Sequence, residues 1–235
     1  MKKKSIFFDF GGTLAHLYPS REQVFYNVCA GLGIETDLKK IRDAYFYVEF
    51  FNKYSSVNIK NISQKKDFYA KYNQQLCYLL GIETKYKEIN KRLFKSFKNS
   101  EWILFDDTVK SLKTLKTKNL FIGLISNWDA NLPYLLKSYN IENYFDDIAV
   151  SKTVGFEKPD VNFYKYVLKK NKNILKYKEK YYVGDDYILD VVPSRKAGMI
   201  PIIIDRIKMF PKKADCLIFE SVEKFVSFYL KQMEQ

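Results

Sequence analysis

Four short segments of the sequence place acidic, hydroxyl-bearing or basic side chains at or near the ends of apolar runs. A carboxylate at the tip of a buried strand can act as a nucleophile, and carboxylates gathered together bind divalent cations through their oxygen atoms. A lysine in the same place would offset the negative charge of a group in transfer. The segments are residues 9–13 (DFGGT), 126–127 (SN), 158–159 (KP) and 184–186 (GDD), the last followed by Asp190.

Each segment taken alone also has a structural interpretation. Ser126 can cap the helix that follows it, and Lys158 can be an ordinary surface lysine. Asp185 and Asp186 can begin a helix, where a negative charge meets the positive end of the helix dipole. The combination of the four segments is more specific than any one of them, provided that the fold brings them together.

The elements that would position these segments follow from the hydrophobic pattern. Five apolar runs are predicted to be buried parallel strands, and helical patterns lie between them, with Asp107 and Asp160 as expected N-caps. Alternating strands and helices predict an α/β fold, a Rossmann-like open parallel sheet with helices on both faces. In such a sheet functional groups gather at the carboxyl ends of the strands. The predicted strands are residues 6–8, 120–125, 148–150, 181–183 and 202–204.

The interval between the first two predicted strands is too long for one strand-helix-strand unit. Apolar residues recur through it at helical spacing, after a candidate capping box of Ser20 with Gln23 and after Asp37. We therefore predict an α/β core made of residues 1–15 and 101–235, with an all-helical domain of residues 16–100 inserted into it.

The composition narrows the class of protein. No apolar run approaches the length of a membrane span, and Asp9 interrupts the first apolar run too early for a signal peptide. Cys29, Cys77 and Cys216 are odd in number and form no metal-binding pattern. They are typical of reduced thiols in a cytoplasmic protein, and we expect no association with a membrane.

The formal net charge is +13, and residues 16–100 hold 15 Lys and Arg against 8 Asp and Glu. Scattered lysines usually form a solvated surface, but a basic domain would also attract an anionic substrate. No recognised nucleic-acid motif is present, so nucleic acid is not the expected partner. We expect a small phosphorylated substrate and a monomer or homodimer.

The segments follow one another in a characteristic order: residues 9–14, 124–127, 155–160, and 183–186 with Asp190 and 197–199. This order resembles the four motifs of the haloacid dehalogenase superfamily. A helical insert after the first motif resembles the cap domain of one subfamily. The resemblance covers residues 1–15 and 100–210 and does not extend to details of the insert.

The resemblance implies a Mg²⁺-dependent hydrolase of a small phosphorylated metabolite that forms an aspartyl-phosphate intermediate. Asp9 would be the nucleophile. Asp9, Asp185 and the Gly11 carbonyl would bind the Mg²⁺ ion, and Asp190 would bind it directly or through water. Acidic groups so close together repel one another unless a cation is present, which agrees with this assignment.

The remaining motif residues would hold the phosphoryl group. Ser126 and backbone N–H groups near Gly12 and Asn127 would bind its oxygens, and Lys158 would screen the nucleophile and the transferring group. Thr13 would orient the loop. Two adjacent glycines also let the chain turn sharply and bring N–H groups close to an anion.

Gly11 is a departure from the family pattern, because phosphatases of the family usually have there an aspartate that protonates the leaving oxygen. General acid-base catalysis is typically worth ~10²–10⁴ in rate. The substrate could have a good leaving group, His16 could supply the proton, or the protein could be a catalytically impaired, phosphate-binding regulatory protein. Family members that act on carbon–phosphorus or carbon–halogen bonds also lack this aspartate, so hydrolysis of a phosphonate or at another carbon centre is an alternative.

Overall fold

The computed structural model describes residues 4–53, 62–177, 179–210 and 215–233. It comprises two compact units, each with its own core. One unit is Met1–His16 together with Ile103–Gln235, and the other is Leu17–Trp102. The helical segment therefore interrupts the α/β unit directly after its first strand and loop.

The first unit is built on a parallel sheet of six strands, in which β1 (Ser5–Phe8) lies between β4 and β6. Phe8 is in register with Leu124 of β4 and with Val183 of β6. The residues that follow these three strands therefore emerge at one edge of the sheet, which confirms the predicted α/β architecture. The other strands are β4 (Phe121–Ser126), β5 (Asp147–Val150), β6 (Lys180–Gly184), β7 (Ile200–Ile204) and β8 (Leu217–Phe219).

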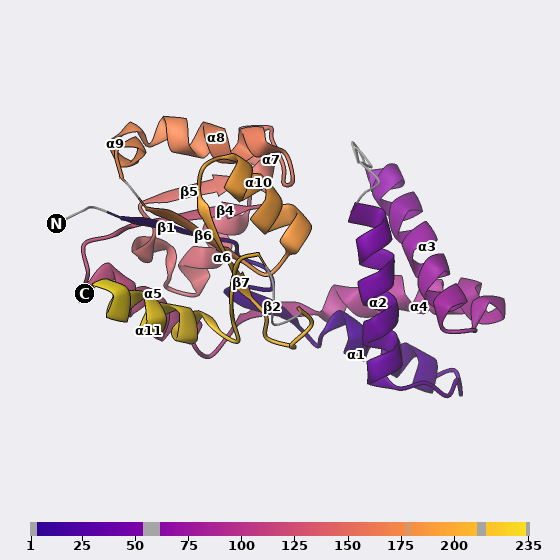
Figure 1. Ribbon diagram of the computed structural model, residues 1–235. Coiled ribbons are helices and arrows are strands. Elements are labelled where there is room, and N and C mark those ends of the chain that lie inside the picture. The colour runs from indigo at the N-terminus through magenta and orange to yellow at the C-terminus, as the bar shows by residue number, and fades with distance from the viewer. Residues whose placement is uncertain (1–3, 54–61, 178, 211–214, 234–235) are drawn as a thin grey trace. The chain divides into compact units, whose positions relative to one another are not determined.

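Helices cover both faces of this sheet (Figure 1). Successive strand residues point to opposite faces, so Tyr182 contacts Tyr164 of α8, whereas Tyr181 contacts Tyr229 of α11. Both tyrosines thus pack against helices, as the doubly apolar strands predict. The helices and short turns of this unit are α5 (Thr108–Lys116), α6 (Leu132–Ser138), η3 (Glu142–Tyr144), α7 (Ser151–Val154), α8 (Val161–Lys170), α9 (Lys172–Leu175), η4 (Tyr187–Val191), α10 (Val192–Lys196) and α11 (Val222–Met233).

Three strands and one cap differ from the sequence analysis. Strand β8 was not predicted, and β2 (Ala15–Tyr18) pairs with β3 (Glu101–Leu104) in a small sheet of its own. Asp107 occupies the N-cap position of α5, as predicted, but its carboxylate accepts hydrogen bonds from Arg206 and from the Glu223 amide and none from an amide of α5. Asp160 does cap α8, accepting a bond of 2.8 Å from the Asn162 amide.

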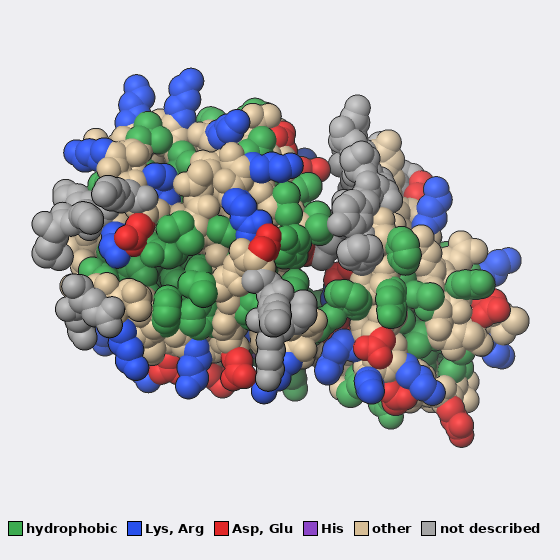
Figure 2. Space-filling view, viewed as in Figure 1, with side chains coloured by type: hydrophobic (Ala, Val, Ile, Leu, Met, Phe, Trp, Pro, Cys, Tyr) green, Lys and Arg blue, Asp and Glu red, His purple; other side chains and the backbone are tan. Residues whose placement is uncertain are grey.

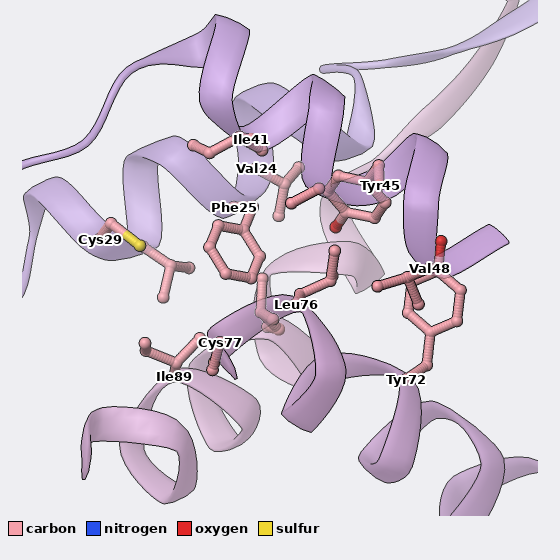
Figure 3. Close-up of a cluster of buried hydrophobic side chains, with 13 residues drawn as sticks. Val24, Phe25, Cys29, Ile41, Tyr45, Val48, Tyr72, Leu76, Cys77 and Ile89 are labelled. Atoms are coloured by element: carbon pink, nitrogen blue, oxygen red, sulfur yellow. The ribbon is translucent and has the colours of Figure 1, made fainter. Parts of the chain in front are cut away.

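The second unit is helical. The Ser20 hydroxyl caps its first helix by accepting a bond from the Gln23 amide, and Asp37 accepts one from the Lys40 amide at the start of the next. Side chains from all the long helices meet in one apolar core (Figure 3). The elements are α1 (Arg21–Ala30), α2 (Leu38–Lys53), α3 (Ile62–Leu79), η1 (Glu83–Lys85), α4 (Tyr86–Ser96) and η2 (Phe97–Asn99).

The surface agrees with the charge pattern of the sequence. On the face shown in Figure 2, Lys and Arg side chains are spread over the described surface, with Asp and Glu side chains among them. Such dispersed charge is typical of solvated side chains. Among the described residues, none of the helices is both long enough and apolar enough to cross a bilayer.

Candidate active site

Three strands of the parallel sheet deliver the acidic and hydroxyl residues to one place. Asp9 follows β1, Ser126 is the last residue of β4, and Asp185 follows β6. The Asp9 amide donates a 2.9 Å hydrogen bond to the Val183 carbonyl, so the ladder between β1 and β6 continues to this residue. The parallel register therefore places the predicted nucleophile beside the predicted metal-binding segment.

Lys158 reaches the same place from the loop before α8, although it lies far away in the sequence. Its ammonium nitrogen is 2.8 Å from Asp9 Oδ1 and 2.7 Å from Asp190 Oδ1. Its backbone is held by Asn127: the Lys158 amide donates to Asn127 Oδ1, and Asn127 Nδ2 donates to the Lys158 carbonyl. The Asn127 side chain therefore ties the second motif to the third.

Asp9, Asp185 and Asp190 form a cluster in which one carboxylate oxygen from each lies within 4.8 Å of the others. Oxygen ligands of this kind suit a hard divalent cation such as Mg²⁺. Thr13 Oγ1 donates to Asp185 Oδ1 at 3.3 Å. Gly12 has a φ of +80°, and a Cβ atom there would lie 2.2 Å from Asp185 Oδ2, so the loop needs glycine at this position.

The two oxygens of Asp190 have different partners. Oδ1 contacts Lys158, while Oδ2 accepts hydrogen bonds from the amides of Asp185 and Asp186 at 3.1 and 3.0 Å. A Cβ atom at Gly184 would lie only 2.3 Å from the same Oδ2, which explains the glycine before the acidic pair. Asp190 therefore also shapes the loop on which Asp185 is carried.

Asp186 is adjacent to Asp185 but has a structural role. Its Oδ1 atom accepts hydrogen bonds from the amides of Ile188 and Leu189, at 2.9 and 3.0 Å, and so caps the turn that follows. The helix-capping interpretation of this acidic pair thus holds for Asp186. Asp185, by contrast, belongs to the carboxylate cluster.

The electrostatics of the cluster reflect an excess of negative charge. Burial raises the pKa of Asp185 well above its usual range, and the carboxylates of Asp190 and Asp9 raise it further. Burial also raises the pKa of Asp190, to about 6, against the opposing effect of Lys158. Burial acts to lower the pKa of Lys158, but the carboxylates of Asp190 and Asp9 outweigh it, so that pKa is raised and Lys158 carries its charge.

Two supporting residues were missed by the sequence analysis. The Tyr182 hydroxyl donates to the Ile125 carbonyl at 2.9 Å, and its oxygen lies 3.2 Å from both Lys158 Nζ and Asp190 Oδ1. Arg206 donates to the Thr13 carbonyl at 2.8 Å. The only local signals were the polar hydroxyl of Tyr182 within the buried strand β6 and the position of Arg206 just after strand β7.

The first-motif loop is also held by its own backbone. The Gly12 amide donates a 2.7 Å hydrogen bond to the Ala15 carbonyl, so this N–H already has a partner. His16 lies in β2, with its ring stacked on Phe105 at a centroid distance of 4.6 Å. Ser126 is buried at the end of β4. The proposed proton-donating role of His16 stays a prediction.

Comparison with known proteins agrees with this geometry. The family model of haloacid dehalogenase-like hydrolases matches residues 6–204. A glyceraldehyde 3-phosphate phosphatase of Methanocaldococcus jannaschii is 29% identical over 210 residues, which cover 86% of this chain and 84% of that protein. The human haloacid dehalogenase-like hydrolase domain-containing protein 3 is 27% identical over 156 residues; the match covers 64% of this chain and 59% of the human protein.

The fold is also shared with solved structures. The crystal structure of a HAD phosphatase from Thermococcus onnurineus has a TM-score of 0.56 at 17% identity, covering 96% of this chain and 97% of that one. At this level of identity the likeness supports the fold alone. The family model extends over most of the sequence and includes every segment that contributes to the carboxylate cluster. The chain therefore belongs to the haloacid dehalogenase-like hydrolases.

Proposed function

We propose that this protein is a Mg²⁺-dependent phosphatase that acts on a small phosphorylated metabolite through an aspartyl-phosphate on Asp9. The observation that carries the proposal is the contact of Lys158 with both Asp9 and Asp190 beside a cluster of carboxylates. The relative named glyceraldehyde 3-phosphate phosphatase supports a phosphate ester of a small carbon skeleton as the substrate class.

The residues present fit a magnesium ion. Asp9 and Asp185 are the proposed direct ligands, with the Gly11 carbonyl as a third. Both Asp190 oxygens accept hydrogen bonds from the protein, which favours an indirect role for Asp190 through water. Bound Mg²⁺ would neutralise excess carboxylate charge and polarise the phosphoryl group.

In the proposed first step, Asp9 attacks phosphorus. Lys158 holds Asp9 Oδ1, which fixes the orientation of the carboxylate at the tip of β1. The phosphorus–oxygen ester bond breaks as the new bond to Asp9 forms, and the leaving oxygen takes a proton from water. The Lys158 ammonium, kept charged by its two carboxylate neighbours, offsets the negative charge that the transition state spreads over the phosphoryl oxygens.

In the second step, water attacks the phosphorus of the aspartyl-phosphate, which releases inorganic phosphate and regenerates Asp9. Gly11 provides no side chain for either proton transfer. We therefore propose that the enzyme favours substrates whose leaving group needs little protonation, and that the acyl-phosphate persists longer than in relatives with an aspartate at this position. Acid-quench mass spectrometry of Asp9 measures this intermediate directly.

The proposal is tested by phosphate release from 4-nitrophenyl phosphate and from a panel of phosphorylated metabolites that includes glyceraldehyde 3-phosphate. Phosphate release is expected in the presence of Mg²⁺. The rate should fall by at least about 10⁴-fold when EDTA removes the ion or when Asp9 is changed by Asp9→Asn. Asp43→Asn, an exposed aspartate in α2, is the matched control and should keep full activity. Activity that persists in Asp9→Asn would rule out the mechanism.

We also propose that the protein works in the cytoplasm on a small-molecule partner. The three cysteines, Cys29, Cys77 and Cys216, are free thiols in the structure, and Cys29 and Cys77 are buried in the helical core. Unpaired buried cysteines support a reducing environment. Fractionation of cells that express the tagged protein measures its location.

A further inference from the structure

The helical unit contains a pocket whose lining residues have no role in the two chemical steps proposed above. Its volume is about 600 Å³, which is within the range of small-molecule sites. Its walls are mainly aromatic and aliphatic, with Tyr45, Phe68, Tyr72 and Phe94 among them, and every lining residue belongs to residues 17–97. The pocket is therefore a feature of this unit by itself.

One polar group in the pocket wall is the hydroxyl of a buried tyrosine, Tyr72. Tyr72 lies on α3, is 9% exposed, and its ring centroid is 6.0 Å from that of Tyr45. Its hydroxyl oxygen is buried and has no hydrogen-bond partner among the described residues. Figure 3 shows Tyr72 among the apolar side chains of this core. Buried hydroxyl groups are normally hydrogen-bonded, so a molecule that supplies a partner here gains affinity.

The charged groups of the pocket are engaged with one another. Arg21 pairs with Glu49 through both terminal nitrogens, with Nη2 at 3.1 Å from Oε2, and its Nε atom is 2.8 Å from Glu22 Oε1. The guanidinium also lies over the Tyr45 ring, 4.8 Å from its centroid. Arg21 is thus offset by carboxylates on two sides. The other lining cation, Lys66, is exposed and screened by water.

We propose that this pocket binds a compact, uncharged, ring-containing organic group, with the Tyr72 hydroxyl as its hydrogen-bond partner. The aromatic walls favour a ring, the engaged ion pair disfavours an anion, and the buried hydroxyl selects for one hydrogen-bonding atom. The ligand is either a separate molecule or the organic part of a substrate. The proposal does not depend on the phosphatase function.

Indole and 1-methylindole test this proposal, because they have nearly the same shape but only indole has an N–H group. Calorimetric titration of the whole chain is expected to show binding of both. Tyr72→Phe should weaken indole about five- to tenfold and leave 1-methylindole within about twofold, as expected for one hydrogen bond. The melting temperature of Tyr72→Phe should equal or exceed that of the wild type, since the variant loses only an unpartnered hydroxyl.

Two further variants make the test specific. Tyr78→Phe makes the same change on the same helix at a residue that is 72% exposed and outside the pocket, so it should change neither affinity. Phe94→Ala removes a half-exposed wall ring and should weaken both ligands. Failure of indole to bind the wild type, or binding that neither Tyr72→Phe nor Phe94→Ala weakens, would overturn the proposal.

The source of the ligand is resolved by adding indole to the phosphate-release assay. A rise in KM at constant kcat identifies the pocket with the organic part of the substrate, whereas a change in kcat alone, or no change, identifies a separate molecule. Both results are consistent with binding of a ring-containing group in the pocket and differ only in the source of that group. Should the chain release phosphate from no substrate, calorimetry still tests the pocket, so the two proposals fail separately.

Discussion

The two units each contain a cation held by carboxylates, and the two clusters differ in burial and in charge balance. In the α/β unit, Lys158 is 2% exposed in its side chain and contacts Asp9 and Asp190, while Asp185 adds a further carboxylate. In the helical unit, Arg21 is 39% exposed in its side chain and lies between Glu22 and Glu49.

The difference in exposure to water changes what each ion pair contributes to the protein. Water screens the partly exposed Arg21 pairs, so their charges are solvated and contribute modestly to stability. The Lys158 cluster is shielded from water and, among the described residues that form it, has three carboxylates for one lysine, so a bound cation would offset its excess negative charge. Such a site is suited to a divalent ion, whereas the Arg21 pair is suited to forming the wall of a pocket.

Among the variants that alter the two ion-pair clusters, the largest effect is expected from Lys158→Met, which removes the cation from the buried cluster. Phosphate release should fall about 10³-fold or more, because the charge of the transferring group loses its buried counter-charge. Steady-state kinetics at saturating Mg²⁺ measures the change. Lys152→Met, an exposed lysine in the nearby α7, is the matched control and should be silent. If Lys158→Met kept about a tenth of the activity, the cluster would not be the catalytic centre.

Gly11→Asp adds a carboxylate to the first-motif loop of the α/β unit and should supply the missing general acid. Gly11 is not among the described glycines with positive φ, so its backbone suits an aspartate. Activity should rise up to about 10²-fold on alkyl phosphates and less on aryl phosphates, whose leaving groups need less protonation. Gly12→Ala should instead lower activity on both, since its Cβ meets Asp185. Equal or reduced activity of Gly11→Asp on both substrate classes would contradict the expectation.

The response of stability to Mg²⁺ should depend on pH. In the folded, metal-free protein the pKa values of Asp185 and Asp190 are raised, that of Asp190 to about 6, above the ~3.9 of an unfolded aspartate. When the pKa of a carboxyl is higher in the folded than in the unfolded state, the free energy of unfolding falls as pH rises from the unfolded-state pKa through the folded-state pKa.

Thermal melts should therefore show that the Mg²⁺-induced stabilisation is small near pH 4 and grows through pH 6, because protons compete with the ion. At a hundredfold excess over Kd the gain should be about 2.7 kcal/mol. Asp185→Asn should lose this response, and Glu49→Gln in the helical unit should keep it. A stabilisation by Mg²⁺ that did not change with pH would show that the ion does not bind at these carboxylates.

The smallest effect is expected from Glu49→Gln. The Glu49 side chain is 27% exposed and Arg21 keeps Glu22 as a partner, so the free energy of unfolding should fall by about 0.5–1 kcal/mol. Urea denaturation measures the change, with Glu88→Gln, from the exposed pair with Arg92, as the control. A loss above about 3 kcal/mol would show that the Arg21 pair is shielded from water like that of Lys158.

Much of the fold could be predicted because the signals are local. The run before Asp9 is apolar on both faces, which is typical of a buried parallel strand, and the helical spacing after Ser20 and Asp37 predicted the helices that follow. The same reasoning missed β8, which has only three residues, and β2 and β3, which pair with each other outside the main sheet. Short strands with few apolar residues give little periodic signal.

The candidate site could be predicted only as a set of residues. The sequence alone determined the order of the motifs, the glycine at position 11 and the family, because these depend on residue types and their spacing. The structure is needed to see that Asn127 holds the backbone of Lys158 and that Asp186 is a cap. It also shows that Asp190 binds Lys158 with one oxygen and the loop amides with the other. These contacts join strands and loops distant in sequence, so they depend on strand register and packing, which local patterns do not encode.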